Sequence, residues 1–113
     1  MLNKALKILV VDDFPQMREI TDNLLRDLGV ENITQADDGI TALPILESAL
    51  ETTAFDLLIT DWGMPGMNGL ELTQNVRAHE RLSKMPVLMV TSNARRDQIL
   101  LAQAAGVDAY IVK

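Results

Sequence analysis

The 113-residue sequence contains no cysteine, which excludes disulfide bonds and thiolate metal sites. Its one histidine, His79, cannot by itself build a zinc site or a catalytic triad. No apolar run approaches the roughly 20 residues of a membrane-spanning helix, and we find no signal-peptide pattern. We therefore expect a cytoplasmic protein that makes no contact with a membrane.

Basic residues are also scarce. The chain has 10 Lys and Arg residues against 16 Asp and Glu residues, and its formal net charge at pH 7 is −6. A phosphate backbone would repel such a chain, so we expect no nucleic acid as a direct partner. A cation or a basic protein surface suits it better. The length predicts a single domain over residues 1–113, and the composition is that of a globular protein.

Apolar runs alternate with helical patterns along the whole chain. Near-continuous apolar runs at 6–11, 55–60 and 86–91 are typical of strands that are buried on both faces of a parallel sheet. Shorter strand candidates lie at 32–37 and 108–113. Helical patterns fill the intervals at 15–29, 38–50, 68–80 and 93–106. This alternation, with right-handed crossovers, predicts an α/β fold with a doubly wound, five-stranded parallel sheet.

Two of the helical patterns contain proline. The first has Pro15 at a plausible first helical position and ends at Gly29. Its apolar stripe consists of Met17, Ile20, Leu24 and Leu28. The second contains Pro44, which lacks an N–H donor. That helix tolerates the proline best if Thr41 caps it, so that Pro44 falls in the first turn, or if it kinks there.

Polar residues follow the predicted strands at their carboxyl ends. Asp12 and Asp13 close the first strand, Asp61 the third, Thr91 the fourth and Lys113 the fifth. Ligands of doubly wound sheets bind at this edge. Three acids, a hydroxyl and an ammonium group therefore converge on one place, which indicates a ligand site.

The charges in this group suggest which ligand binds. Two carboxylates about 5 Å apart repel by on the order of 3 kcal/mol at an effective dielectric constant of 20. Protonation, Lys113 or a cation must relieve this repulsion. Hard oxygen ligands without His or Cys favour Mg²⁺, and the absence of an EF-hand loop disfavours Ca²⁺. A carboxylate beside Mg²⁺ and a lysine can accept a phosphoryl group, and Asp61, which stands alone before the turn at 62–69, is our candidate.

Four segments carry a resemblance to a known family. "VVDD" after the first strand, "DWGMPGMNGLEL" after the third, "PVLMVTS" at the fourth and "AYIVK" at the end resemble the receiver domain of two-component response regulators. The closest resemblance is to the single-domain chemotaxis regulators of the CheY type. It runs the length of the chain and implies the flavodoxin-like strand order 2-1-3-4-5.

The resemblance implies a chemical role for each residue of the group. Asp12 and Asp13 would bind Mg²⁺ together with the Asp61 side chain and the Gly63 carbonyl. Asp61 would accept a phosphoryl group from a phosphohistidine of a sensor histidine kinase, and Lys113 would contact the phosphoryl oxygens. The protein would catalyse only its own phosphorylation and dephosphorylation and would not otherwise be an enzyme.

The resemblance also implies a switch and a target face. Thr91 would move to hydrogen-bond the phosphoryl group, and Tyr110 would swing from an exposed to a buried rotamer. The face around Ser92, Arg96, Ile99 and Tyr110 would bind the downstream target, which in the chemotaxis subgroup is the flagellar switch.

The sequence departs from the chemotaxis relatives near this site. Gly63 stands where they carry Asn, and Asn93 replaces their Glu. Both positions would border the water that hydrolyses the acyl phosphate, so the departures bear on the lifetime of the phosphorylated form.

The family continues past the lysine with a proline and a fifth helix, whereas this sequence ends at Lys113. Without that helix, roughly 400–500 Å² of apolar surface would be bare, worth about 10 kcal/mol at 25 cal/mol per Å². Either the natural chain is longer or the bare face finds a partner. Our hypothesis is self-association or exchange of elements between copies.

Other interpretations remain open on the sequence alone. Asp12 and Asp13 could simply cap the helix that begins near Pro15. Rival functions are a Mg²⁺-dependent phosphohydrolase, an FMN-binding flavodoxin-like protein and a receiver-type docking module that is never phosphorylated. The phosphohydrolase lacks a second Asp two residues after its nucleophile, and paired acids would repel the FMN phosphate. The favoured function is a phosphorylation-dependent switch, most plausibly in chemotaxis.

Overall fold

The computed structural model describes residues 5–92 and 95–113. The strands are β1 (Lys7–Val11), β2 (Asn32–Ala36), β3 (Leu57–Thr60), β4 (Val87–Thr91) and β5 (Ala109–Val112). The helices are α1 (Pro15–Asp27), α2 (Gly39–Ala49), α3 (Gly69–Ala78) and α4 (Arg96–Ala105). Every predicted element is present in the expected order. Asn93, one of the two departures near the site, lies outside the described residues.

All five strands are parallel and lie in the order β2-β1-β3-β4-β5, which confirms the predicted doubly wound sheet. In the register of the central strands, Val11 of β1 lies opposite Thr60 of β3. Because Asp12 directly follows Val11 and Asp61 directly follows Thr60, this register places the two acids side by side. On the other side of β3, Thr60 lies opposite Met89 of β4, and Thr91 lies opposite Val112 of β5.

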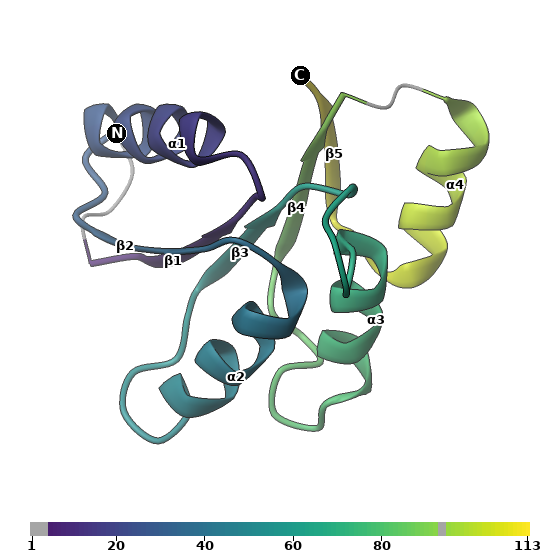
Figure 1. Ribbon diagram of the computed structural model, residues 1–113. Helices are drawn as coiled ribbons and strands as arrows, with labels where there is room; N and C mark the ends of the chain where they lie inside the picture. Colours follow the sequence, from purple (N-terminus) through teal and green to yellow (C-terminus); the bar gives the residue numbers. More distant parts are fainter. Residues whose placement is uncertain (1–4, 93–94) are drawn as a thin grey trace.

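The helices cover the two faces of the sheet unequally. Helix α1 lies on one face, and α2 and α3 lie on the other (Figure 1). Helix α3 contacts both α2 and α4. The larger apolar cluster fills the space between the sheet and α2, α3 and α4, and includes Leu58, Leu72 and Met89. The smaller cluster lies beneath α1 and consists of Ile8, Val10, Leu25, Val30 and Ile59.

The predicted apolar stripe of α1 is not a core stripe. Ile20, Leu24 and Leu28 are 47–58% exposed, and Leu25 is the buried residue of the helix. The stripe turns away from the small core because only one flank of α1 reaches the sheet. On the same side of the sheet, Ile111 of β5 is 50% exposed. We call these four residues the open α1 face.

The helix ends follow local chemistry. Pro15 occupies the first turn of α1, as expected. Helix α2 is capped by Asp38, whose carboxylate accepts a hydrogen bond from Thr41 N, so the expected Thr41 cap is wrong. Because the helix begins before Thr41, Pro44 lies in its interior and not in its first turn. Helix α4 ends at Gly106, whose φ of 103° favours glycine.

Candidate functional site

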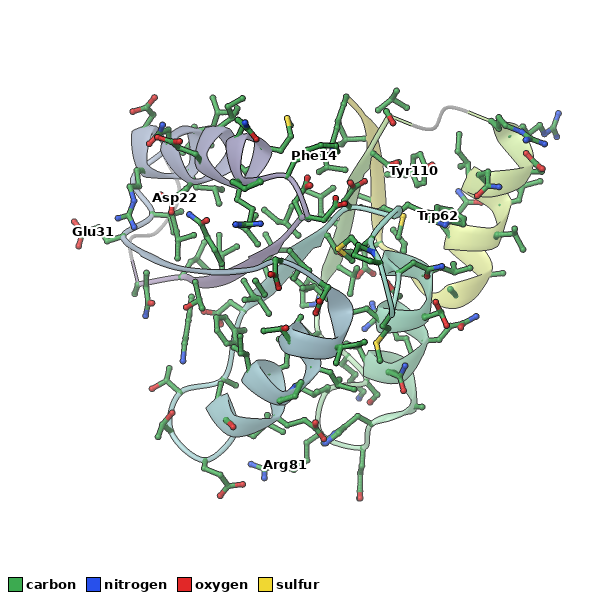
Figure 2. All side chains as sticks on the ribbon, in the orientation of Figure 1. Phe14, Asp22, Glu31, Trp62, Arg81 and Tyr110 are labelled. Atoms are coloured by element: carbon green, nitrogen blue, oxygen red, sulfur yellow. The ribbon has the colours of Figure 1, made fainter. Side chains whose placement is uncertain are left out.

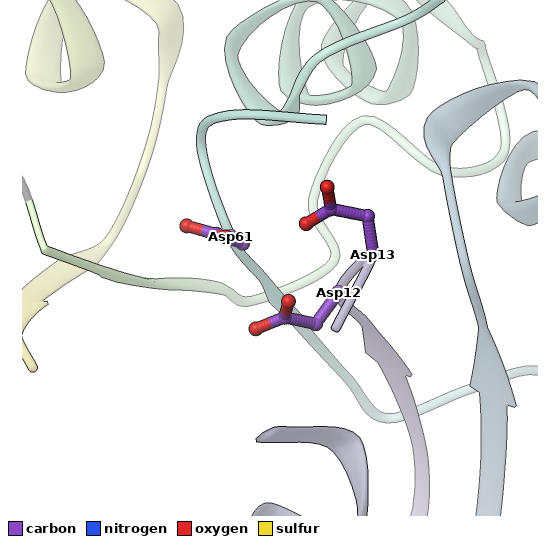
Figure 3. Close-up of side chains that lie close together, drawn as sticks. All are labelled: Asp12, Asp13 and Asp61. Carbon is purple, nitrogen blue, oxygen red and sulfur yellow. The ribbon is translucent and has the colours of Figure 1, made fainter. Parts of the chain in front are cut away.

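Three carboxylates meet at the carboxyl ends of β1 and β3. Asp12 and Asp13 follow β1, and Asp61 follows β3; one carboxylate oxygen of each lies within 4.8 Å of the others (Figure 3). The Asp12 and Asp61 residues are only 6% and 8% exposed. The structure thus brings together the three acids that the strand endings predict to converge.

Main-chain donors hold two of these carboxylates. Phe14 N donates to Asp12 Oδ1 at 3.0 Å, and Trp62 N donates to Asp61 Oδ1 at 2.7 Å. Asp61 N in turn donates to Val11 O at 2.9 Å, which joins the ends of the two strands. The other carboxylate oxygen of each residue, Oδ2, lies close to Lys113.

Lys113 supplies the positive charge of the group. Its Nζ lies 3.1 Å from Asp12 Oδ2 and 3.3 Å from Asp61 Oδ2, and its side chain is 19% exposed. Lys113 N also donates to Thr91 O at 2.7 Å. Burial opposes the charge of Lys113, but the hydrogen bond to Asp12 and the charges of Asp61 and Asp12 outweigh it and raise its pKa above the ordinary 10.5.

The donor set fits a divalent cation. Asp13 Oδ1 is buried and has no hydrogen-bond partner among the described residues. A buried carboxylate oxygen of this kind is costly unless an ion or hydrogen bond satisfies it. Three carboxylates against one ammonium group leave two negative charges, and oxygen ligands without His or Cys suit Mg²⁺.

The capping interpretation of the acids is wrong. The residue at the N-cap position of α1 is Phe14, and no side chain caps this helix. Asp12 does accept a hydrogen bond from Phe14 N, but that bond closes the turn before the helix and does not satisfy a helical donor. The two acids therefore do not cap α1.

A cleft of about 420 Å³ opens beside Asp61. Its lining consists of Phe14, Met17, Asp61, Trp62, Gly63, Thr91, Ser92 and Lys113. A side chain at Gly63 would meet no atom within 4 Å, so packing does not require glycine there. Phe14, at the start of α1, and Trp62, which directly follows Asp61, are labelled in Figure 2. Sequence reasoning missed Phe14 and Met17 as cleft residues, because a helix start with apolar residues carries no signal of its own.

Gly69 is a further residue that the sequence analysis missed. A Cβ at this position would lie 1.9 Å from the main-chain oxygen of Asp61, so only glycine fits. Gly69 N donates to Trp62 O at 2.8 Å, and the Asn68–Glu71 capping box begins α3 here. This close contact holds the turn after Asp61. The Asn68-Gly69 pair at the start of the predicted helix was the sequence feature that could have indicated this turn.

The residues expected to form the target face separate into two groups. Ile99 and Tyr110 line one groove of about 270 Å³ between α4 and β5, whereas Ser92 lines the cleft beside Asp61. Arg96 is exposed at the start of α4. Tyr110 is half-buried against the larger core, and burial, followed by the charge of Asp61, raises the pKa of its phenol above 10.0.

Among the described residues, no helix has the length and apolar character that crossing a membrane requires.

Close relatives are chemotaxis proteins. The chain is 56% identical over 112 residues to chemotaxis protein CheY-3 of Vibrio cholerae, a match that covers 99% of this chain and 83% of that protein. It is 59% identical over 108 residues to chemotaxis protein CheY of Pseudomonas aeruginosa, covering 96% and 84%.

Solved structures share the fold. The Vibrio cholerae chemotaxis protein CheY4, at 31% identity, superposes with a TM-score of 0.82 over 96% of this chain and 86% of that one. The receiver domain of the histidine kinase CKI1 from Arabidopsis thaliana, solved with Mg²⁺ and BeF₃⁻, gives a TM-score of 0.85 at 26% identity over 96% and 81%.

The family assignment agrees with these relatives. Residues 8–113 match the response regulator receiver domain, a segment that begins in β1 and includes all three acids and Lys113. Proteins of this family transmit signals and are not metabolic enzymes. By sequence, fold and matched length, the chain belongs to the response regulator receiver domain family.

Proposed function

We propose that this protein is a phosphorylation-operated switch in which Asp61 accepts a phosphoryl group from a phosphohistidine of a sensor histidine kinase. The observation that carries the proposal is the surroundings of Asp61. Its carboxylate faces Lys113 Nζ at 3.3 Å, lies with Asp12 and Asp13 within 4.8 Å, and lines an open cleft. A buried acid with these neighbours is a nucleophile that a phosphoryl donor can reach.

The same acids provide the cation site. Asp12, Asp13, the Asp61 side chain and the Gly63 carbonyl would hold Mg²⁺, and the unpartnered Asp13 Oδ1 supports this assignment. When bound, Mg²⁺ neutralises charge on the transferring phosphoryl oxygens. The CKI1 receiver domain, which shares this fold, has been solved with that ion.

The transfer is a displacement at phosphorus. A carboxylate oxygen of Asp61 forms the new O–P bond while the P–N bond of the phosphohistidine breaks. The electron pair of that bond returns to the ring nitrogen, and the histidine leaves as neutral imidazole if its other nitrogen carries a proton. The ammonium group of Lys113, close to Asp61 Oδ2, stabilises the negative charge on the phosphoryl oxygens.

The switch would act through Thr91 and Tyr110. Thr91 ends β4, is buried, and lines the same cleft as Asp61. Tyr110 lies on the adjacent β5 and, with Ile99, lines the groove between β5 and α4. Phosphorylation would thereby change the affinity of the groove for a downstream target. Because close relatives are chemotaxis proteins, we propose a cytoplasmic role in chemotaxis with a target such as the flagellar switch.

Mass measurement after incubation with a small acyl phosphate tests this function. We expect one added phosphoryl group, labile to base, that requires Mg²⁺ and is lost in Asp61→Asn. The control is Asp37→Asn, since Asp37 is an exposed acid at the end of β2 and should leave phosphorylation intact. Wild-type protein that stays unmodified would instead support a docking module that is never phosphorylated. Steady release of inorganic phosphate from unrelated phosphate esters would support a phosphohydrolase.

A further inference from the structure

Arg18 of α1 reaches the main chain between the two paired acids. Its Nη1 donates to Asp12 O at 2.6 Å, and the side chain is half-buried. The oxygen of Asp12 belongs to the peptide group that joins Asp12 to Asp13. A hydrogen bond to this oxygen therefore restricts the plane of that peptide group, on which the direction of the Asp13 side chain depends.

Gln35 of β2 holds Arg18, and Asp22 of α1 holds Gln35. Arg18 Nε donates to Gln35 Oε1 at 3.3 Å, and Gln35 Nε2 donates to Asp22 Oδ2 at 2.9 Å. Asp22, labelled on α1 in Figure 2, also pairs with Arg26. This chain of side chains links α1 and β2 and ends on the main chain of the acid pair. A guanidinium with several fixed partners loses little freedom when it holds a further group.

The three carboxylates differ in what positions them. Asp12 has Phe14 N and Lys113, and Asp61 has Trp62 N and Lys113. Asp13 Oδ1 has no such partner among the described residues. The place of the Asp13 carboxylate is thus set largely by its own backbone, and the bond from Arg18 acts on that backbone.

We infer that Arg18 is a positioning residue, which holds the Asp12–Asp13 peptide group so that the Asp13 carboxylate faces the cation site. The inference rests on the proposed function, because it concerns the cation site used there. Removing a hydrogen bond that orients a metal ligand commonly weakens metal binding by about 10- to 100-fold.

Charge and positioning make opposite predictions for Arg18. A guanidinium close to a cation site repels the cation, so its removal tightens Mg²⁺ binding if charge is its only effect. If Arg18 instead positions the acid pair, its removal weakens Mg²⁺ binding. The sign of the change therefore separates the two effects.

The experiment is a Mg²⁺ titration at constant ionic strength, followed by fluorescence of Trp62, the one tryptophan of the chain and a neighbour of Asp61. We expect Arg18→Met to weaken Mg²⁺ binding about tenfold and Arg18→Lys to recover part of that loss. Arg81→Met is the matched control, since Arg81 also donates to a main-chain oxygen, that of Leu50, and lies outside the chain of side chains that holds Arg18. It should bind Mg²⁺ as wild type does.

Gln35→Leu keeps every charge and keeps the bond from Arg18 to Asp12, but removes the partner of Arg18 Nε. We expect a smaller weakening than for Arg18→Met, and this variant carries the test if Arg18→Met fails to fold. If Arg18→Met folds and binds Mg²⁺ as tightly as wild type or more tightly, the inference is overturned. If Arg18→Met does not fold, unchanged Mg²⁺ affinity in Gln35→Leu overturns it. Either result leaves the proposed function standing. Absence of Mg²⁺ binding in the wild type overturns both.

Discussion

The two faces of the sheet differ in how completely helices cover them. On one face, α2, α3 and α4 enclose a large core in which Leu58 and Leu72 are fully buried. On the other, α1 alone covers a small core, and Ile20, Leu24 and Leu28 of that helix stay about half exposed. The site lies at the edge that both faces share. We infer that the face covered by α2, α3 and α4 supplies most of the folding energy, while the other face carries the positioning contacts of α1.

The largest expected effect comes from truncating one side chain on each face and comparing the losses in stability. Leu58→Ala removes a fully buried side chain, whereas Leu24→Ala removes one that is 58% exposed. We expect Leu58→Ala to lower the free energy of unfolding by about 2–5 kcal/mol and Leu24→Ala to change it by less than about 0.5 kcal/mol. Urea denaturation followed by circular dichroism measures both. Similar losses for the two variants would show that α1 packs as tightly as the opposite helices.

Lys113 links the edge strand β5 to the acids of the central strands. Lys113→Met leaves Asp12 and Asp61 without their ammonium partner, so we expect a loss of about 1–3 kcal/mol in unfolding free energy at pH 7.

The loss should depend on pH in one direction. The folded pKa of Lys113 is raised, so its stabilising contribution is complete below the ordinary value of 10.5 and disappears as the pH rises through the folded pKa. Denaturation curves from pH 7 to above that value should show the two proteins converging only at the alkaline end. A difference between them that grows with pH would mean that Lys113 does not pair with the acids as a cation.

The exposed apolar residues of the open α1 face predict that the chain associates with itself. We propose that the 113-residue chain, in which α1 alone covers this face among the described residues, self-associates through Ile20, Leu24, Leu28 and Ile111. Sedimentation should then give a mass above that of one chain. Leu24→Glu should return the protein to the monomer with little change in unfolding free energy.

Leu101→Glu provides the control for that variant. Leu101 is a leucine on α4 with 50% exposure, and it lies outside the open α1 face. Leu101→Glu should leave the mass measured by sedimentation unchanged from that of the wild type. A wild-type chain that is strictly monomeric and folds cooperatively would contradict the self-association.

Much of the fold followed from the sequence for simple reasons. The apolar runs of β1 and β3 are buried on both faces, as their near-continuous apolar pattern predicts, whereas β4 is buried on one face and half-buried on the other, where α1 alone covers the sheet. The convergence of Asp12, Asp13 and Asp61 also followed, because strand order and strand endings determine which side chains meet. The site was therefore predictable to the extent that it depends on topology.

The remaining features depend on contacts that sequence patterns do not encode. The stripe of α1 has helical spacing, but spacing alone does not show which flank meets the sheet, and Leu25 proved to be the buried residue. Asp38 and Thr41 are both good caps, and only the Asp38–Thr41 hydrogen bond distinguishes them. Arg18 lies six residues from the carbonyl that it contacts, and nothing in its neighbourhood marks that bond.

The central claim is that the three acids repel one another and share one cation, and Asp13→Asn tests it most directly. The measurement is the free energy of unfolding of wild type and Asp13→Asn, with and without Mg²⁺. Without metal, the variant should be more stable by about 1–3 kcal/mol, because one repelling charge is gone. With saturating Mg²⁺ the order should reverse, since only the wild type gains fully from binding. A variant that is less stable in both conditions would contradict the account and would make Asp13 a structural residue.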